Sequence, residues 1–592
     1  MSELHQESLR SNYRDWVLFK RVVDYLKPYR ALVLLAVFFL FCVSILSLAG
    51  PYLTKIAIDD HISVSSLDGL DQIAIIYIIV LGVAFICQFF QTYLMQYIGQ
   101  KVMYDLRTQT FAHMHRMSFK FFDRNPIGKL ITRVVNDVEV LNEMLTSGLI
   151  LVFSDLFILA GIFCMMLYLD WRMTLVVCVI FPLLYLATRA YRIRARDALR
   201  KNRAHITRLN SFLEENLSGM PTVHLFHREK NHEEKFKAIN KDKVNEDLRS
   251  IHYNSVYLPS IDVFSAIGMA LVIWYGGGRF VQEQVQLGVL VAFLQYLQKF
   301  FEPIRDLAEK FNIIQTAIAS AERTFELLDT PEDMIDPPTP VPVKQVRGQV
   351  EFRNMWFSYK KDEYVLKNIS FSLLEGESLA VVGATGAGKS SLINALCRFY
   401  EIAQGDILLD GVSIKEMSKY DVRRQISLVQ QDVFLFSGNI LDNIRLGNSD
   451  LPSEHIELVA QSVNLNTFVD RLPSRYDQDI REKGSMLSLG QKQLLSFARA
   501  LAADPRILVL DEATSSIDTE TERHIQNGIK ELIRGRTSII IAHRLSTLKH
   551  VDKIIVLKEG QMVEHGTQKE LLQEQGIYWK LYNLQEGSGV KR

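Results

Sequence analysis

The sequence predicts an α-helical membrane domain followed by a soluble α/β domain. Residues 31–300 contain long stretches without charged side chains, whereas residues 345–592 have the mixed composition of a soluble domain. The stretch 330–344 between them is rich in proline, which blocks helix continuation and is typical of a linker. The predicted boundaries are 1–30 for an N-terminal amphipathic segment, 31–328 for the membrane domain, 329–348 for the linker and 349–592 for the soluble domain.

Composition excludes several classes of protein. The chain has 592 residues, 48% of them hydrophobic, and its 67 basic residues balance its 67 acidic residues. This length allows several domains, the neutral charge argues against a nucleic-acid-binding protein, and the apolar content excludes a disordered chain. The 5 cysteines are scattered and form neither a disulfide framework nor a metal-binding box.

The first domain is predicted to cross the membrane six times. A helix needs about 20 apolar residues to cross the hydrocarbon core of a bilayer. The candidate spans are residues 31–49, 72–100, 144–169, 173–188, 263–278 and 285–298. The shorter runs are flanked by apolar or amphipathic sequence that completes a span.

Basic residues indicate the orientation of the spans. Lysine and arginine are concentrated before the first span, between the second and third, and between the fourth and fifth. The positive-inside rule therefore places both termini in the cytoplasm. The long connections 101–143 and 189–254 are expected to form antiparallel helix pairs that extend the spans into the cytoplasm. Residues 13–29 have the apolar period of an amphipathic surface helix, with a disordered leader as the alternative.

A phosphate-binding motif lies in the second domain. Residues 383–390 read Gly-Ala-Thr-Gly-Ala-Gly-Lys-Ser, between an apolar strand-like run and a helical segment. Glycine lets backbone N–H groups surround phosphate oxygens beside a helix N-terminus, where a Cβ would obstruct them. Lys389 would neutralise the β- and γ-phosphates and Ser390 would bind Mg²⁺. The predicted binding residues of this loop are Gly383, Ala384, Thr385, Gly386, Ala387, Gly388, Lys389, Ser390 and Ser391.

A second motif is a pair of carboxylates after an apolar strand. Residues 507–510 are Ile-Leu-Val-Leu, and Asp511 and Glu512 follow directly. Parallel strands deliver their C-terminal residues to the ligand crevice of such a sheet. Asp511 therefore suits the Mg²⁺ shell through water, and Glu512 suits polarising the attacking water. A solvated acidic turn is the alternative interpretation.

Further motifs carry a family resemblance over essentially the whole chain. Residues 487–491, Leu-Ser-Leu-Gly-Gln, resemble the ABC signature LSGGQ and stand in the order phosphate loop, signature, carboxylate pair, Asp518 and His543. The chain thus resembles an ABC exporter half-transporter of the type IV class, of the bacterial multidrug-resistance-like MdlB type. The resemblance implies six transmembrane helices with long cytoplasmic extensions, fused to an α/β P-loop ABC ATPase domain.

The resemblance also implies roles for individual residues. Tyr359 is expected to stack on adenine, and Gln431 to sense Mg²⁺ and the membrane domain. Asp518 belongs to the D-loop, and His543 is the switch histidine that touches the γ-phosphate. Ser488, Gly490 and Gln491 meet the nucleotide bound by the other half of a dimer. The implied catalytic residues are Glu512, His543, Lys389 and Gln431, the implied metal ligands are Ser390, Gln431 and Asp511, and the cofactors are ATP and Mg²⁺.

Parts of the membrane domain share the likeness. Residues 121–128 with Arg133 and Asp137, and residues 215–226 with Gly219, resemble the two cytoplasmic coupling regions. Residues 50–59 match the end of the family's first span. Asp155 and Asp262 are expected to face the interior of the bundle, because a carboxylate is costly in lipid. Positions near the membrane interface are the alternative for both.

The implied function is ATP-driven export, or flipping between leaflets, of a hydrophobic or amphipathic substrate across the cytoplasmic (inner) membrane. The chain would work as one half of a dimer, with membrane lipid as its surroundings and no nucleic acid partner. Leu489 replaces the first glycine of the signature pair, which favours a heterodimer with a second ABC half-transporter. The alternatives are a homodimeric lipid or drug flippase and an ATP-gated channel or regulator.

Overall fold

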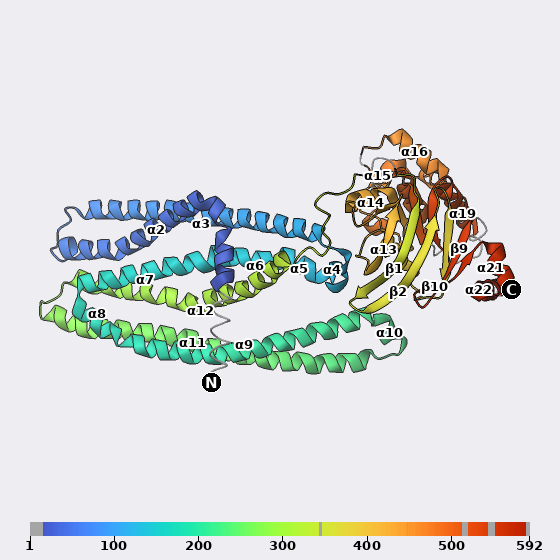
Figure 1. Ribbon diagram of the computed structural model, residues 1–592. Helices are drawn as coiled ribbons and strands as arrows, with labels where there is room; N and C mark the ends of the chain where they lie inside the picture. The colour runs from blue at the N-terminus through green and yellow to red at the C-terminus, as the bar shows by residue number, and fades with distance from the viewer. Residues whose placement is uncertain are drawn as a thin grey trace. The chain divides into compact units, whose positions relative to one another are not determined.

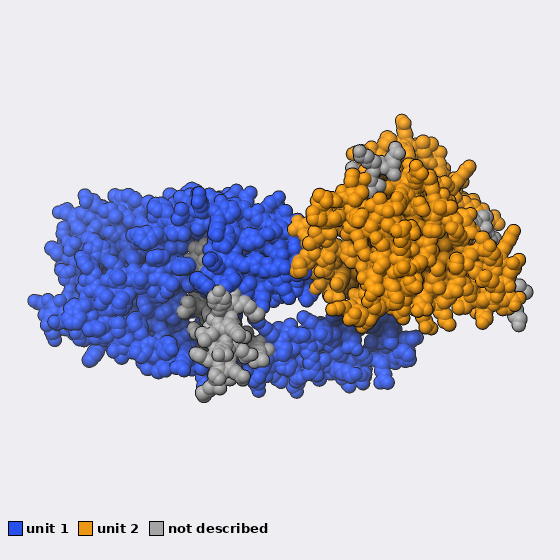
Figure 2. Space-filling view, in the orientation of Figure 1, with its two compact units in different colours: residues 1–115, 128–330 blue, residues 116–127, 331–592 orange. Residues whose placement is uncertain are grey.

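The computed structural model divides the chain into two compact units. Unit 1 comprises residues 1–115 and 128–330, and unit 2 comprises residues 116–127 and 331–592 (Figure 2). The structure describes residues 16–342, 346–446, 448, 450–511, 519–542 and 551–587. The boundary after residue 330 lies within the proline-rich stretch, while the short segment 116–127 leaves the helical unit and joins the other one.

Unit 1 is built from long helices that run side by side (Figure 1). In chain order they are η1 (Lys27–Tyr29), α2 (Arg30–Ile56), η2 (Ala57–Ile62), α3 (Leu70–Arg116), α5 (Ile127–Thr132), η3 (Arg133–Asp137), α6 (Val138–Glu143), η4 (Met144–Leu149), α7 (Ile150–Leu169), α8 (Trp171–Cys178), α9 (Ile180–Ser218), α10 (Met220–Leu225), α11 (Glu229–Val281) and α12 (Leu287–Asp329).

Five helical stretches in the described part of the chain are long and apolar enough to cross a membrane. They are Lys27–Ile62, Leu70–Arg116, Ile127–Leu169, Trp171–Tyr191 and Glu229–Val281. They contain the first five predicted spans. The sixth predicted span, 285–298, lies in α12, which is not among the five, so a sixth crossing remains a prediction.

The connection 189–254 forms the expected antiparallel pair. Helix α9 ends at Ser218 before Gly219, and Pro221 lies in the first turn of the short helix α10. Proline is favoured at this position because its missing N–H has no intrahelical role there. Helix α11 then returns along α9. Leu217, Leu225 and Phe226 are exposed at this turn, so the tip of the pair presents apolar side chains.

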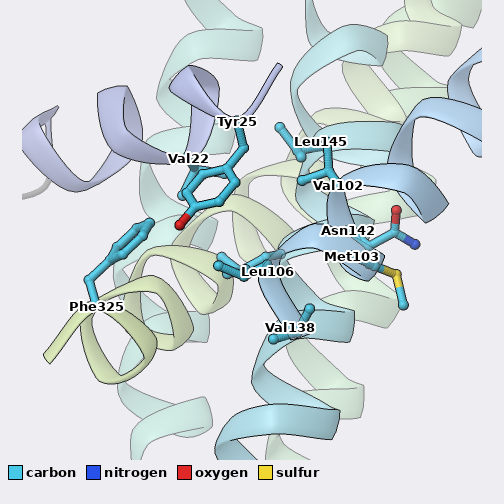
Figure 3. Close-up of a pocket in the computed structure, with 10 residues that line it drawn as sticks. Val22, Tyr25, Val102, Met103, Leu106, Val138, Asn142, Leu145 and Phe325 are labelled. Atoms are coloured by element: carbon cyan, nitrogen blue, oxygen red, sulfur yellow. The ribbon is translucent and has the colours of Figure 1, made fainter. Parts of the chain in front are cut away.

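The N-terminal segment is helical over residues 16–24 and packs on unit 1. Figure 3 shows Val22 and Tyr25 facing Val102 and Leu106 of α3 and Phe325 of α12, which together line a small apolar pocket. Arg21 contributes a bidentate ion pair to Asp329, with hydrogen bonds of 2.6 and 2.8 Å. Residues 16–24 are thus helical, with Leu18 and Val22 buried against protein, and the position on the membrane surface stays a prediction.

Two carboxylates of the membrane helices pair with cations of α12. Asp155 in α7 accepts a hydrogen bond of 2.5 Å from Lys310, and its side chain is 15% exposed. The expected interior position is therefore confirmed for Asp155. Asp262 in α11 pairs with Arg305, but its side chain is 60% exposed. Its expected interior position stays a prediction, and the ion pair compensates its charge.

Unit 2 has two sheets around one apolar core. A sheet in the order β10-β9-β3-β8-β7-β6 is parallel except for β10, and a second sheet in the order β2-β1-β4-β5 is antiparallel. The strands are β1 (Val350–Lys360), β2 (Glu363–Leu373), β3 (Ser378–Gly383), β4 (Gln404–Leu409), β5 (Val412–Ser413), β6 (Ile426–Val429), β7 (Ile507–Asp511), β8 (Thr537–Ile541), β9 (Lys553–Lys558) and β10 (Gln561–Gly566).

Helices complete unit 2. They are α4 (Phe119–Arg124), α13 (Lys389–Leu396), α14 (Lys419–Gln425), α15 (Ile440–Arg445), α16 (Ser453–Ser462), α17 (Asn466–Val469), η5 (Arg475–Asp477), η6 (Glu482–Gly484), α18 (Leu489–Ala502), α19 (Thr519–Ile533), α21 (Gln568–Glu574) and α22 (Ile577–Gly587). The central strands β3, β7 and β8 are almost wholly buried, as expected for a parallel sheet covered on both faces. The predicted parallel sheet is confirmed.

Candidate nucleotide-binding site

The phosphate loop connects the end of β3 to the start of α13. Gly386 and Gly388 have φ of +84° and +104°, a region in which side chains are strained. A Cβ on Gly388 would also lie 2.6 Å from Leu366 Cδ2. Ala384, Thr385 and Gly386 are exposed, whereas Ala387 and Gly388 are buried. The glycines therefore let the backbone turn tightly while its outer edge stays open to a ligand.

Lys389 lies at the first position of α13, directly after this loop. Its Nζ donates hydrogen bonds of 2.7 Å to Gly383 O and 3.1 Å to Ala384 O. Burial lowers the pKa of the Lys389 ammonium, and the nearby Asp511 carboxylate opposes that shift. A buried cation beside a helix N-terminus favours an anionic ligand, which fits phosphate.

The predicted metal ligands lie at or after the carboxyl ends of strands in the parallel sheet. Ser390 follows Lys389 in α13, Asp511 ends β7, and the exposed Gln431 follows the end of β6. Among the described residues, no group of three His, Cys, Asp or Glu side chains could hold a metal alone. This donor set fits Mg²⁺, which is usually bound by one or two carboxylates together with substrate phosphates.

Tyr359 is positioned by α13. Its hydroxyl donates to Ser391 Oγ at 3.1 Å and accepts from Asn394 Nδ2 at 2.9 Å. These bonds hold the ring of a β1 residue against the helix that begins at the phosphate loop. Tyr359 also meets Tyr400 edge to face, with ring centroids 5.0 Å apart.

The signature residues form the N-terminus of α18. Ser488 is the N-cap and Gln491 completes a capping box: Ser488 Oγ accepts from Gln491 N at 3.3 Å, and Gln491 Oε1 accepts from Ser488 N at 2.9 Å. Gly490 is buried, and the Leu489 side chain is 44% exposed. The free end of this helix can approach an anion, but an apolar side chain stands beside it.

Three predicted residues, Glu512, Asp518 and His543, lie outside the described residues. Their roles stay predictions. The structure thus joins the phosphate loop, Lys389, Ser390, Ser391 and Tyr359 in one place. It puts Asp511 near Lys389, and it puts the signature residues on a separate helix N-terminus of the same unit.

Sequence reasoning missed one connection of this site. Tyr400 donates a hydrogen bond to Asp123 of α4, and Phe399 stacks on Phe119 with centroids 4.4 Å apart. Burial, together with the bond to Asp123, raises the pKa of Tyr400, so its phenol stays a donor at neutral pH. The adjacent aromatic residues Phe399 and Tyr400 after α13 indicate a contact in the sequence, but they do not identify the residues that they contact.

Two family models match the chain. The ABC transporter transmembrane region matches residues 33–304, and the ABC transporter model matches residues 366–515. An uncharacterised ABC transporter ATP-binding protein, YknV of Bacillus subtilis, is 36% identical over 98% of this chain and 96% of its own. An ATP-dependent lipid A-core flippase of Syntrophus aciditrophicus is 33% identical over 96% of this chain and 94% of its own.

A solved structure has the same architecture. The structure of a bacterial Atm1-family ABC exporter with ATP bound matches with a TM-score of 0.78 and 25% identity. The match covers 94% of this chain and 98% of that chain.

We predict that Gly388→Ala abolishes nucleotide binding, because the new Cβ meets Leu366 and the backbone needs a positive φ. Gly376→Ala is the matched control, since Gly376 also has positive φ (+77°) but has nothing within 4 Å of the added carbon. Each variant carries a conformational cost of about 1 to 2 kcal/mol. Titration with a fluorescent nucleotide measures binding in each variant, and thermal unfolding measures its stability. Equal loss of binding in both variants would contradict the prediction.

Proposed function

Because the chain belongs to the ABC transporter family and is an exporter-type ATPase, we propose that it moves a hydrophobic or amphipathic substrate out of the cytoplasm or between leaflets. The observation that carries the proposal is the fusion of apolar membrane-length helices with a complete phosphate loop. The lipid A-core flippase among its relatives supports an amphipathic substrate. The basic connections support a cytoplasmic membrane with both termini inside.

Each residue of the site has a proposed part in ATP hydrolysis. The loop N–H groups and Lys389 bind the phosphates, and Tyr359 stacks on the base. Ser390, Gln431 and Asp511 hold Mg²⁺, which supplies charge neutralisation at the phosphates. Glu512 orients and polarises the attacking water, and His543 contacts the γ-phosphate.

We propose that α4 transmits the state of this site to the membrane helices. Tyr400 touches Tyr359 on one side and Asp123 on the other. Arg116 and Glu332 add an ion pair of 2.7 Å within the same unit. Since α4 follows α3 directly in the chain, a shift at Tyr359 reaches the end of a membrane helix through two side chains.

The dimer is proposed to be a heterodimer. The phosphate loop of this chain matches the motif in full, whereas Leu489 adds a branched side chain to the signature where the family has glycine. A partner with an intact signature would complete the ATP site of this chain. A homodimer that tolerates Leu489 is the alternative, since Ser488, Gly490 and Gln491 remain.

The function is tested by ATPase and transport measurements in liposomes. We expect Mg²⁺-dependent ATPase activity that Lys389→Ala abolishes and Glu512→Gln lowers by about 10²-fold or more, because positioned acid–base groups contribute this much. Steady hydrolysis coupled to substrate movement supports an exporter. Substrate or ion flow without hydrolysis would instead favour an ATP-gated channel, and normal turnover in Glu512→Gln would reject the role of that residue.

Tyr400→Phe is expected to uncouple hydrolysis from transport. The variant keeps the ring contact with Tyr359 but loses the hydrogen bond to Asp123, a charged acceptor whose bond is worth about 1.5–3 kcal/mol. Nucleotide affinity should stay near normal, while substrate moved per ATP falls severalfold. Tyr364→Phe is the control, because it removes an exposed hydroxyl that accepts from Gln404. An unchanged transport ratio in Tyr400→Phe would contradict the coupling route.

The chain purified alone is expected to have low ATPase activity that a co-expressed homologous half restores. Leu489→Gly in the isolated chain should raise its activity, since it returns the close backbone approach of the signature. The measurement is ATPase rate against oligomeric mass. A stable dimer of this chain with full substrate-stimulated activity would refute the heterodimer.

A further inference from the structure

Helix α12 carries polar side chains within and directly after its predicted span, residues 285–298. Gln295, Gln298, Lys299 and Glu302 interrupt an otherwise apolar run. Lys299 lies about 18 Å along the helix from Leu287, at 1.5 Å per residue, so a crossing of about 30 Å that begins near Leu287 includes it. An ammonium group at this depth is costly unless protein or trapped water surrounds it.

The backbone of α2 fixes the Lys299 ammonium. Pro51 lies inside α2 and has no N–H, so the carbonyl of Ser47, four residues earlier, lacks its helical partner. Lys299 Nζ donates to Ser47 O at 2.7 Å. One turn earlier on α12, the buried Tyr296 donates its hydroxyl to Leu48 O at 2.6 Å. The carbonyl freed by Pro51 and these two bonds therefore set the position of the charge.

The charge of Lys299 is not neutralised by an ion pair, as the charges of Arg305 and Lys310 on the same helix are. Arg305 pairs with Asp262 and Lys310 pairs with Asp155, each across to another helix. Lys299 donates to a neutral carbonyl instead. The Glu302 carboxylate interacts with it electrostatically, but no ion pair joins Lys299 to a carboxylate among the described residues. Glu302, on the next turn, is exposed. An ammonium has three N–H donors, so two remain for another acceptor.

We propose that Lys299 binds the acid group of the transported molecule, and that the substrate is an amphiphile with a carboxylate or phosphate on an apolar body. An anion would neutralise the charge and take up the remaining donors, while the apolar residues of the spans would receive its tail. Charge-assisted hydrogen bonds of this kind are the stronger ones. The proposal rests on the proposed export function and adds the chemical class of its substrate.

The test compares matched amphiphiles that differ only in the acid group. Lysophosphatidic acid is compared with the monoacylglycerol of the same chain, and palmitic acid with methyl palmitate. The active full-length dimer is reconstituted in phosphatidylcholine vesicles, so that the bulk lipid carries no net charge. The readouts are the concentration for half-maximal ATPase stimulation and ATP-dependent movement of the lysolipids. We expect the acid of each pair to act at a concentration about 10-fold or more lower, given the strength of hydrogen bonds to charged groups.

Three variants make the test specific. Lys299→Gln should remove the preference for the acid while keeping the response to the neutral partner, which also shows that the variant is folded. Lys299→Arg should retain the preference. The double variant Asp155→Asn with Lys310→Gln removes another α12 charge together with its counter-ion and should also retain it.

Several results would overturn the proposal. They are equal stimulation by both members of each pair in the unmodified chain, a preference that persists in Lys299→Gln, and a loss in Lys299→Gln that is equal for acid and neutral compounds. An acidic lipid that binds through Lys299 without being moved would contradict its role as substrate. A different result would contradict the export function itself. In that case neither these compounds nor neutral and cationic drugs stimulate ATPase activity or move across the vesicle membrane.

Discussion

In the hydrocarbon of a bilayer, a charged or hydrogen-bonding side chain must find its partner within the protein. In unit 1, helix α12 takes part in many of these polar contacts. Polar contacts tie it to several neighbouring elements. In order along α12, the contacts are Gly288 N–Asp59, Lys299–Ser47 O, Arg305–Asp262, Lys310–Asp155, Arg323–Asp137, Glu326–Arg133 and Asp329–Arg21. The first joins α12 to η2, and the last joins it to the N-terminal segment. A displacement of α12 therefore requires new partners for groups on several helices at once.

In unit 2, the direction of the strands determines where the residues of the site lie. Because β3, β7 and β6 run parallel, the phosphate loop, Asp511 and Gln431 all follow carboxyl ends of strands at one edge of the sheet. The antiparallel sheet contributes Tyr359, held by bonds to α13. The segment 116–127 packs on this unit, so the chain that comes from α3 contacts the nucleotide-binding domain before the membrane domain is complete. This order of the chain is the basis of the proposed route from the ATP site to a membrane helix.

Local patterns predicted much of this architecture. Apolar length predicted the membrane helices, and the glycine-rich motif predicted the phosphate loop with Lys389, because both signals lie within one stretch of sequence. The contacts that join distant stretches were not predicted. Tyr400 and Asp123 lie 277 positions apart, and no periodicity in either segment indicates the other. The partnership of Lys299 with Ser47 O has a local signal in Pro51, which frees a carbonyl, but the sequence does not say which donor takes it. The antiparallel sheet was also not predicted, because its strands lack the uninterrupted apolar runs of the parallel one.

The partners of the α12 cations divide them into two kinds. Arg305 and Lys310 both face carboxylates. Separating the largely buried Lys310–Asp155 pair would leave two charges without compensation inside the protein and is strongly opposed. Such pairs fix which helices stay together. Lys299 faces a carbonyl, whose dipole satisfies one N–H but leaves the net charge in place. An arriving anion can therefore add to this bond without displacing a charged partner. The same helix thus combines contacts that resist change with one ammonium whose electrostatic energy would improve when an anion enters, beside the carbonyl that Pro51 frees in α2.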